Sequence, residues 1–257
     1  MSREREPLPT HVRDTPTLAP AYDETLLRGL AALGLDLDAT ARAAIDGHVR
    51  LLLAWTGSIN LTAVREPAEV ALRHVIDSLA AVDWLRSHGV VRLLDLGSGG
   101  GFPGLPLAAA LPVTRVMLLE PIAKKAGFLA AAAEATGLAQ RVTVVRARAE
   151  ETGRELEHRF RWEAVTARAV APLGNLVELG FPLLEHQGSL IAWKRGDIDL
   201  ELEAARRAID ALGGGTLDVR DVPVADLDGH RLVVATRTGL VPDGYPRDPA
   251  VRRRRPW

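Results

Sequence analysis

The sequence predicts an α/β protein in which a seven-stranded, mostly parallel sheet follows a helical N-terminal module. The first observation is a change of rhythm after Gly89, where short apolar segments begin to alternate with pieces long enough for a helix. The second is a run of glycines in residues 97–104, directly after an apolar strand and before a helix. The third is the dipeptide Asp228-Gly229 between the last two apolar segments, which predicts an antiparallel hairpin.

The N-terminal part of the chain divides into a tail and a helical module. Four prolines and several charges in residues 1–20 leave little apolar surface to bury, so we expect a disordered tail there. Residues 21–88 follow a helical pattern, in which apolar residues such as Ile45, Val49 and Leu52 recur at helix spacing. Pro67 is expected to begin a further helix of this module.

Residues 89–240 form the predicted sheet domain, and residues 241–257 a basic C-terminal tail. Strands are expected near 91–96, 114–120, 141–147, 163–167, 188–194, 216–224 and 230–238. Helices fall between them, including one at 123–136 that ends at Gly137 and one at 199–211. Five parallel units closed by an antiparallel hairpin form a Rossmann-like sheet, an arrangement typical of S-adenosylmethionine-dependent methyltransferases.

Composition excludes several classes of protein. The 257 residues can bury a full core, and a net charge of −1 excludes a uniformly basic surface, so nucleic-acid binding would need local patches. Without cysteine the chain has no disulfide, thiolate metal site or cysteine nucleophile, and its histidines lack metal-ligand spacing. Because no segment is apolar enough for a membrane span or a signal peptide, we expect a cytoplasmic protein.

The glycine run and two acids indicate the cofactor. A dinucleotide loop needs glycine at its first, third and sixth positions; Gly97 and Gly99 fill the first two, but the sixth is Phe102. S-adenosylmethionine instead presents a sulfonium cation, an ammonium group and a ribose, which carboxylates suit. We expect Asp95 to position the loop and the ammonium group, and Glu120, which closes the next strand, to accept both ribose hydroxyls.

Further candidates lie at the ends of later strands. Ala149 and Glu150 follow the third strand, where such folds contact adenine, although two adjacent acids more often begin a solvated helix. Arg168 ends the fourth strand and could order the cofactor pocket or donate to guanine O6; the alternative is a salt bridge to a nearby acid.

A polar group on one predicted helix is a candidate for the substrate pocket. His74, Asp77 and Ser78 share one face at i, i+3 and i+4, and Asn60 precedes them in the linking segment. They could line the pocket, or they could form a polar network that docks the N-terminal helices onto the sheet. We do not expect a Ser/His/Asp triad, because one short helical stretch cannot supply the geometry of nucleophile, base and orienting acid together with an oxyanion hole.

Several segments closely resemble the ribosomal RNA small-subunit methyltransferase G family, also called RsmG or GidB. They are residues 59–65, 73–79, 97–104, 166–172, 192–196 and 229–234, in matching order between about 40 and 240. The resemblance implies methyl transfer from S-adenosylmethionine to guanine N7 in 16S rRNA near the decoding region. It also places Gly97, Phe102, Ala149, Glu150 and Arg168 at cofactor-binding positions. Two departures are Arg195, which intrudes between lysine and glycine, and Glu120, where aspartate is frequent.

The residues fit methylation of a ring nitrogen. The sequence has no Asn/Asp-Pro-Pro-Tyr/Phe segment to hold an exocyclic amine, and no cysteine to add to a pyrimidine. Guanine N7 has an exposed lone pair and no proton to remove, so catalysis can consist mainly of alignment. We therefore expect catalytic roles for Arg168, His74 and Asn60 without a dedicated base.

The expected partner is 16S rRNA or the small ribosomal subunit, bound by a monomer without a metal ion. The candidate RNA contacts are Lys124, Lys125, Arg141, Arg146, Arg148, Lys194, Arg195, Arg252, Arg253, Arg254 and Arg255. The alternatives are a methyltransferase of another RNA or a small molecule, an NAD(P)-binding oxidoreductase, and a cofactor-sensing module that has lost catalysis.

Overall fold

A computed structural model describes residues 8–257 and contains one seven-stranded sheet. Its strands are β1 (Arg92–Leu96), β2 (Arg115–Leu119), β3 (Val142–Val145), β4 (Trp162–Arg168), β5 (Leu184–Arg195), β6 (Gly215–Asp221) and β7 (His230–Arg237). They lie in the order β3-β2-β1-β4-β5-β7-β6. Strands β1 to β5 are parallel, and β7 is antiparallel to both β5 and β6. The predicted fold class is confirmed.

The connection between β6 and β7 is longer than predicted. The strands pair antiparallel, as the sequence indicated, but Val222 to Gly229 separate them and include a short 3-10 turn at Ala225–Leu227. Asp228-Gly229 therefore only ends this connection and does not form a two-residue turn. The apolar segments on both sides of the dipeptide led us to expect two strands joined by a tight turn. Leu227 instead belongs to the connection, where it is buried in the core that contains the N-terminal helices.

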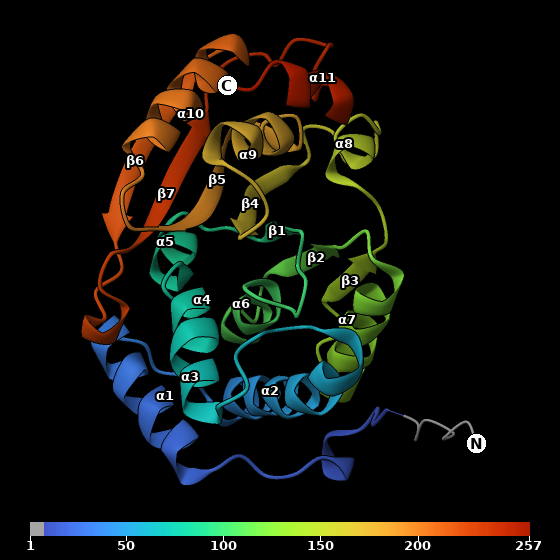
Figure 1. Ribbon diagram of the computed structural model, residues 1–257, viewed down its shortest axis with the longest axis vertical. Helices are drawn as coiled ribbons and strands as arrows, with labels where there is room; N and C mark the ends of the chain where they lie inside the picture. The colour runs from blue at the N-terminus through green and yellow to red at the C-terminus, as the bar shows by residue number, and fades with distance from the viewer. Residues whose placement is uncertain (1–7) are drawn as a thin grey trace.

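Helices cover both faces of the sheet (Figure 1). One face carries α1 (Pro20–Leu33), α2 (Ala39–Ile59), α3 (Pro67–Val70), a π-helical stretch (Ala71–Ile76), α4 (Asp77–Leu79), α5 (Val82–Ser87), α6 (Gly104–Ala110) and α7 (Ala123–Ala135). The other carries α8 (Ala149–Thr152), α9 (Leu173–Gly180), α10 (Asp199–Ala211) and α11 (Pro249–Arg254). Strand β1 shows why two layers form, because Leu93 packs into the first core and Leu94 into the second.

The N-terminal helices share a core with the sheet. Ile45 of α2 and Val75 of the π-helical stretch belong to the same buried cluster as Leu93 and Val116 of the strands. Local signals set the helix limits: Asp38 accepts a hydrogen bond from the backbone N–H of Ala41 at 2.7 Å and so caps α2. The division into a module at 21–88 and a domain at 89–240 stays a prediction.

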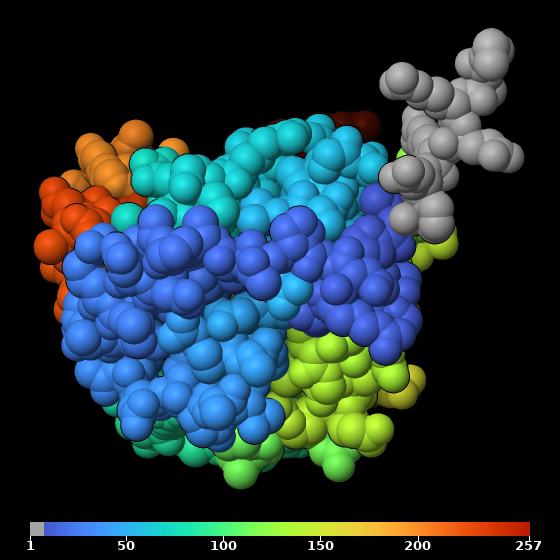
Figure 2. All heavy atoms as spheres, turned by 90° about the horizontal axis from the view of Figure 1, so that it is seen from below, coloured from blue at the N-terminus to red at the C-terminus, as the bar shows by residue number. Residues whose placement is uncertain are grey.

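The prediction of a disordered tail at 1–20 is wrong for residues 8–19. The indole N–H of Trp55 donates to the carbonyl of Pro9 at 2.7 Å, and Arg50 donates to the carbonyls of Thr15 and Pro16 at 2.5 and 2.8 Å. Figure 2 shows this segment in dark blue, lying over the underside of the molecule. Proline has no backbone N–H, so a proline-rich segment needs few acceptors, and the side chains of α2 supply donors for its carbonyl groups. The rest of the predicted tail, residues 1–7, lies outside the described residues.

The predicted C-terminal tail is folded as well. Glu178 of α9 is fully buried, and its carboxylate accepts hydrogen bonds from Arg247 at 2.6 Å and from the indole N–H of Trp257 at 2.8 Å. Between these two anchors runs α11, which Figure 1 shows beside α8 and α9. The acidic partners lie far away in sequence, so the arginines looked unpaired. Within residues 8–257, no helix is both long and apolar enough to cross a membrane.

Candidate functional site

The glycine run forms the loop between β1 and α6, at the edge of the sheet where the parallel strands end. Several of its glycines leave no room for a side chain, as Gly101 and Gly104 show. Gly101 has a φ of 91°, and a Cβ there would lie 2.7 Å from Nε2 of His48. A Cβ at Gly104 would lie 2.3 Å from Cδ2 of Leu118. The loop is therefore held close against both α2 and β2.

Asp95 fixes the loop from below. Its side chain is fully buried, and its two oxygens accept hydrogen bonds from the hydroxyl of Thr166 at 2.8 Å and from the backbone N–H of Gly104 at 3.2 Å. Burial raises the pKa of Asp95 to about 6. This carboxylate thus joins β1, β4 and the end of the loop. Its predicted contact with the methionine ammonium group stays a prediction.

Glu120 closes the other side of the loop. It is 4% exposed, and its two oxygens accept hydrogen bonds at 2.9 Å from the backbone N–H groups of Gly99 and Ile122. Each carboxylate oxygen has a second lone pair, which leaves acceptors for the hydroxyls of a ribose. The predicted role of Glu120 is compatible with this geometry.

His48 is a site residue that the sequence did not indicate. It is buried, and its Nε2 lies 2.7 Å from the carbonyl oxygen of Gly100, to which it donates. Burial lowers the pKa of His48 to about 4, so the ring is neutral. Its ring centroid lies 4.6 Å from that of Phe102. A lone polar residue in an apolar helical pattern was the only available signal.

Phe102 connects the loop to a second group of residues. Its ring centroid lies 4.9 Å from that of His74, and Cζ of Arg168 lies 5.3 Å from it. Three residues from distant parts of the chain thus meet at the end of β4. Gly97 lies next to them, since a Cβ on it would approach Val170 to 2.7 Å.

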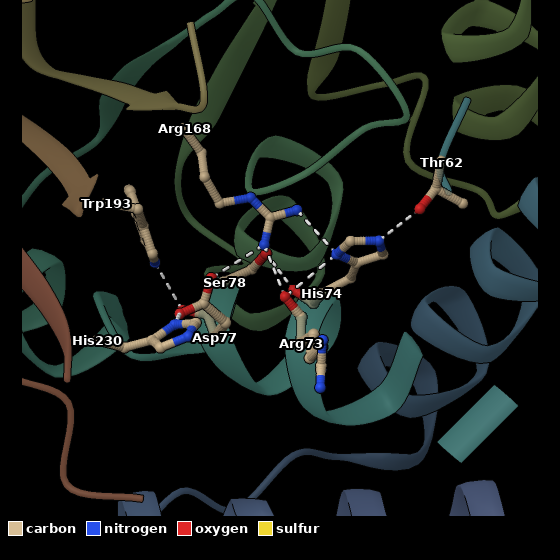
Figure 3. A network of polar contacts seen from close by, with 8 residues as sticks. All are labelled: Thr62, Arg73, His74, Asp77, Ser78, Arg168, Trp193 and His230. Carbon is tan, nitrogen blue, oxygen red and sulfur yellow. Dashed lines mark hydrogen bonds and ion pairs between the residues drawn. The ribbon is translucent and has the colours of Figure 1, made fainter. Parts of the chain in front are cut away.

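Arg168 lies at the centre of a polar network (Figure 3). Its Nη1 donates to Asp77 at 3.0 Å and to the carbonyl of Arg73 at 3.0 Å, and its Nη2 lies 3.3 Å from Nδ1 of His74. The salt bridge that the sequence left as the alternative is therefore present. The same guanidinium also borders an open pocket, so this salt bridge is compatible with a catalytic role. That role stays a prediction.

Asp77 links this network to the antiparallel part of the sheet. Its other oxygen accepts from Nδ1 of His230 at 3.0 Å, and its backbone carbonyl accepts the indole N–H of Trp193 at 2.7 Å. His230 and Trp193 lie in two of the segments that resemble the family, but the sequence did not indicate that either contacts Asp77. Sequence spacing alone could not join them to Asp77, because the sheet topology brings them together.

The helix that carries His74 is not a regular α-helix. Residues 71–76 are π-helical, and the backbone N–H of Asp77 reaches back five residues to Leu72. His74 and Asp77 still meet at Arg168, whereas the hydroxyl of Ser78 turns back to the carbonyl of His74 at 2.5 Å. The predicted common face therefore holds for two of the three residues.

His74 and Asn60 have different surroundings. Nε2 of His74 lies 2.7 Å from the hydroxyl of Thr62, and burial lowers the pKa of His74 to about 4. Asn60 is exposed and ends α2 with a φ of 52°, a conformation that asparagine tolerates. The structure does not place Asn60 in the network of Figure 3.

A pocket of about 580 Å³ opens beside this network. Arg168, Asp77, His74, Trp193 and His230 all line it. It lies next to the carboxyl ends of β4 and β5, on the side away from Glu120. The residues expected to act on a substrate and those expected to hold the cofactor thus occupy neighbouring places along one edge of the sheet.

The predicted adenine residues follow β3. Ala149 and Glu150 begin α8, and both are 9% exposed. The carboxylate of Glu150 is paired with the guanidinium of Arg252 from α11. Arg252, predicted as an RNA contact, therefore lies against a candidate cofactor residue, and we withdraw it from the RNA-binding set.

The other predicted RNA contacts separate into engaged and exposed cations. Lys194 donates to Glu201 at 2.6 Å and to the carbonyl of Ala171 at 3.1 Å, and Arg141 donates to three backbone carbonyls. Those with exposed side chains are Lys124, Arg146, Arg148, Arg195, Arg253, Arg254 and Arg255, and Lys125 is half-buried. In the described part of the chain, acidic residues and histidines form no cluster of three that could hold a metal ion.

Comparison with solved structures supports the fold alone. An O-methyltransferase from Bacillus cereus in complex with S-adenosylhomocysteine matches 81% of this chain and 95% of its own, with a TM-score of 0.52 and 16% identity. An S-adenosylmethionine-dependent O-methyltransferase from Thermotoga maritima matches 73% of this chain and 71% of its own, with a TM-score of 0.51 and 17% identity.

Comparison of sequences identifies the family. Ribosomal RNA small subunit methyltransferase G of Roseiflexus castenholzii is 40% identical over 234 residues, which are 91% of this chain and 99% of the relative. The protein of the same name from Desulforamulus reducens is 35% identical over 90% of this chain and 97% of its own length. The family model described as rRNA small subunit methyltransferase G matches residues 42–225. The chain belongs to the rRNA small subunit methyltransferase G family.

Proposed function

We propose that this S-adenosylmethionine-dependent methyltransferase modifies N7 of a guanine in the 16S rRNA of the small ribosomal subunit. The observation that carries the proposal is a glycine loop held between two carboxylates, in a chain that matches rRNA small subunit methyltransferases over nine-tenths of its length. Family membership replaces the oxidoreductase alternative, which already failed at Phe102. A cytoplasmic location and a monomeric state belong to the same proposal.

The residues at the loop fit the cofactor. Glu120 offers free lone pairs on a carboxylate beside the backbone of Gly99, and Glu150 offers an acceptor at the end of β3. Asp95 is fully buried, and its carboxylate stabilises the conformation of the loop by accepting the backbone N–H of Gly104. S-adenosylmethionine supplies a methyl group on a cationic sulfur, a charge that favours a site with several carboxylates.

The remaining chemistry is positioning. Guanine N7 needs no proton removed, so the protein must bring its lone pair into line with the methyl group. Arg168 is suited to this role because Asp77 and the carbonyl of Arg73 hold it at the mouth of the 580 Å³ pocket. Guanidinium groups bind the O6 edge of guanine, which adjoins N7. The neutral ring of His74 lines the same pocket, and it does not compete with Arg168 for O6 of the guanine.

Chemical mapping of N7-methylguanine tests the proposal. Small subunits from cells that lack this protein are incubated with the purified protein and S-adenosylmethionine, and the rRNA is cleaved at N7-methylguanine. We expect cleavage at one guanine of 16S rRNA. The same guanine should be cleaved in rRNA from cells that contain the protein. Methylation of another atom, or of an RNA other than 16S rRNA, would overturn the proposal. Cofactor binding without any transfer of a methyl group would favour the alternative of a cofactor-sensing module that has lost catalysis.

A further inference from the structure

The C-terminal segment is attached to α9 and α8, the helices that follow β4 and β3. Arg247 and Trp257 bind the buried carboxylate of Glu178 on α9. Cζ of Arg247 also lies 4.4 Å from the ring centroid of Trp257, which brings the two ends of the segment together. Helix α11 is thus held over α8, and residues 241–257 lie beyond the 42–225 that the family model matches.

One arginine of α11 differs from its neighbours. Arg253, Arg254 and Arg255 are exposed, whereas the side chain of Arg252 is 12% exposed and pairs with Glu150. Its Nη1 is buried and finds no acceptor within residues 8–257. A cation that served to attract RNA would be expected to face solvent, as the other three do.

We propose that Arg252 is a positioning residue for the cofactor, which it serves by holding the carboxylate of Glu150 at the end of β3. One oxygen of Glu150 is occupied by Arg252, and the other has no protein partner among the contacts of the described residues. That second oxygen can accept a hydrogen bond from the exocyclic amine of adenine. The inference rests on the proposed cofactor role of Glu150, and it does not depend on which RNA is methylated.

Preorganisation gives the pair its effect. A glutamate at the start of a four-residue helix can adopt several rotamers, and choosing one of them on binding costs free energy. The guanidinium of Arg252, tethered through α11 to Glu178, selects one rotamer before the cofactor arrives. It also neutralises a carboxylate that would otherwise be buried without a counterion.

The test compares two arginines of the same helix. Arg252→Gln and Arg253→Gln each remove one positive charge from α11, but only the first removes the partner of Glu150. Binding of S-adenosylhomocysteine is measured by isothermal titration calorimetry without RNA. We expect Arg252→Gln to weaken binding about tenfold, the effect of losing one hydrogen bond to a charged group. Arg253→Gln should bind as the native protein does.

Kinetics separate positioning from a general loss of structure. For Arg252→Gln we expect KM for S-adenosylmethionine to rise about tenfold while kcat and KM for RNA change less than twofold. Arg252→Lys, which keeps the charge, should recover part of the affinity. A double variant with Glu150→Gln should bind no more weakly than the weaker single variant, because the two residues act as a unit.

Two outcomes would overturn the inference. In the first, folded Arg252→Gln binds S-adenosylhomocysteine as tightly as the native protein. In the second, it loses RNA affinity and keeps cofactor affinity, which would return Arg252 to the RNA-binding set. If Arg252→Gln is unstable, Arg252→Met keeps the apolar stem and serves the same comparison. Failure of the proposed function would appear differently, as native protein that binds S-adenosylhomocysteine but leaves 16S rRNA unmodified.

Discussion

Arg168 has a structural and a proposed catalytic role, and two substitutions separate them. Arg168→Ala leaves the buried carboxylate of Asp77 with His230 as its remaining side-chain partner, so we expect the free energy of unfolding to fall by about 3 kcal/mol. Arg168→Lys keeps the charge but loses the planar set of donors. It should retain most of the stability, measured by urea unfolding, while kcat on small subunits falls at least about tenfold. Full turnover by Arg168→Lys would leave the guanidinium only its structural role.

The buried histidines make stability depend on pH. The pKa values of His48 and His74 are lowered to about 4 in the folded protein, so the unfolded chain binds more protons between pH 6.5 and 4. Their contribution is present above pH 6.5 and is lost as the pH falls towards 4. The raised pKa of Asp95, about 6, acts in the opposite direction over nearly the same range and offsets one histidine.

We therefore expect the free energy of unfolding to fall by about 1 kcal/mol per pH unit between pH 6.5 and 4. In His74→Gln, whose side-chain amide can take the place of Nε2 beside Thr62, one of the two titrating histidines is removed. Urea unfolding at pH 7, 6 and 5 should show a smaller loss for this variant than for the native protein. An equal loss in both would show that His74 is not the group that takes up the proton.

At the scale of elements, the glycine loop depends on the close approach of α6 to β2. A Cβ at Gly104 would lie 2.3 Å from Leu118 and 2.7 Å from Oδ2 of Asp95. We expect Gly104→Ala to cost about 1–3 kcal/mol of stability and to weaken S-adenosylhomocysteine binding, as seen by thermal unfolding and calorimetry. The control is Gly127→Ala on α7, which meets open space and should stabilise the protein by about 0.5–1 kcal/mol. Native cofactor affinity in Gly104→Ala would contradict the proposed role of the loop.

The elements also show how far the sequence could predict the structure. The positions of strands and helices along the chain and the glycine loop followed from apolar periodicity and from glycines placed between a strand and a helix, because these signals are local. Asp77 and His230 are 153 residues apart, and nothing but the folded sheet brings them to 3.0 Å. The same limit applies to Arg252 and Glu150, which sequence composition placed in a tail and at a helix start. Residues 8–19 were misjudged because their partners are side chains of α2.

At the scale of the whole molecule, RNA binding must rely on a few cations, because the net charge is −1. The structure removes Lys194, Arg141 and Arg252 from those available, since protein groups already engage them. Arg253 and Arg254 of α11 and Arg255 directly after it remain exposed, and the inner arginine of the same helix, Arg252, pairs with Glu150. The helix thus has one charged side turned to the protein and another turned to solvent.

Replacing the three exposed arginines together tests this division. Deleting residues 252–257 would also remove Arg252 and Trp257, so we expect it to disturb the fold as well as binding. The variant Arg253→Gln/Arg254→Gln/Arg255→Gln avoids this. Its affinity for 16S rRNA should fall. The negative slope of log affinity against log salt should become less steep by about 2, because each phosphate contact contributes about 0.7 to 0.9 to its magnitude. The affinity for S-adenosylhomocysteine should stay unchanged, since none of the three contacts Glu150. An unchanged salt slope would show that the RNA is held elsewhere, and Lys124, Arg146 and Arg195 would then be the next to replace.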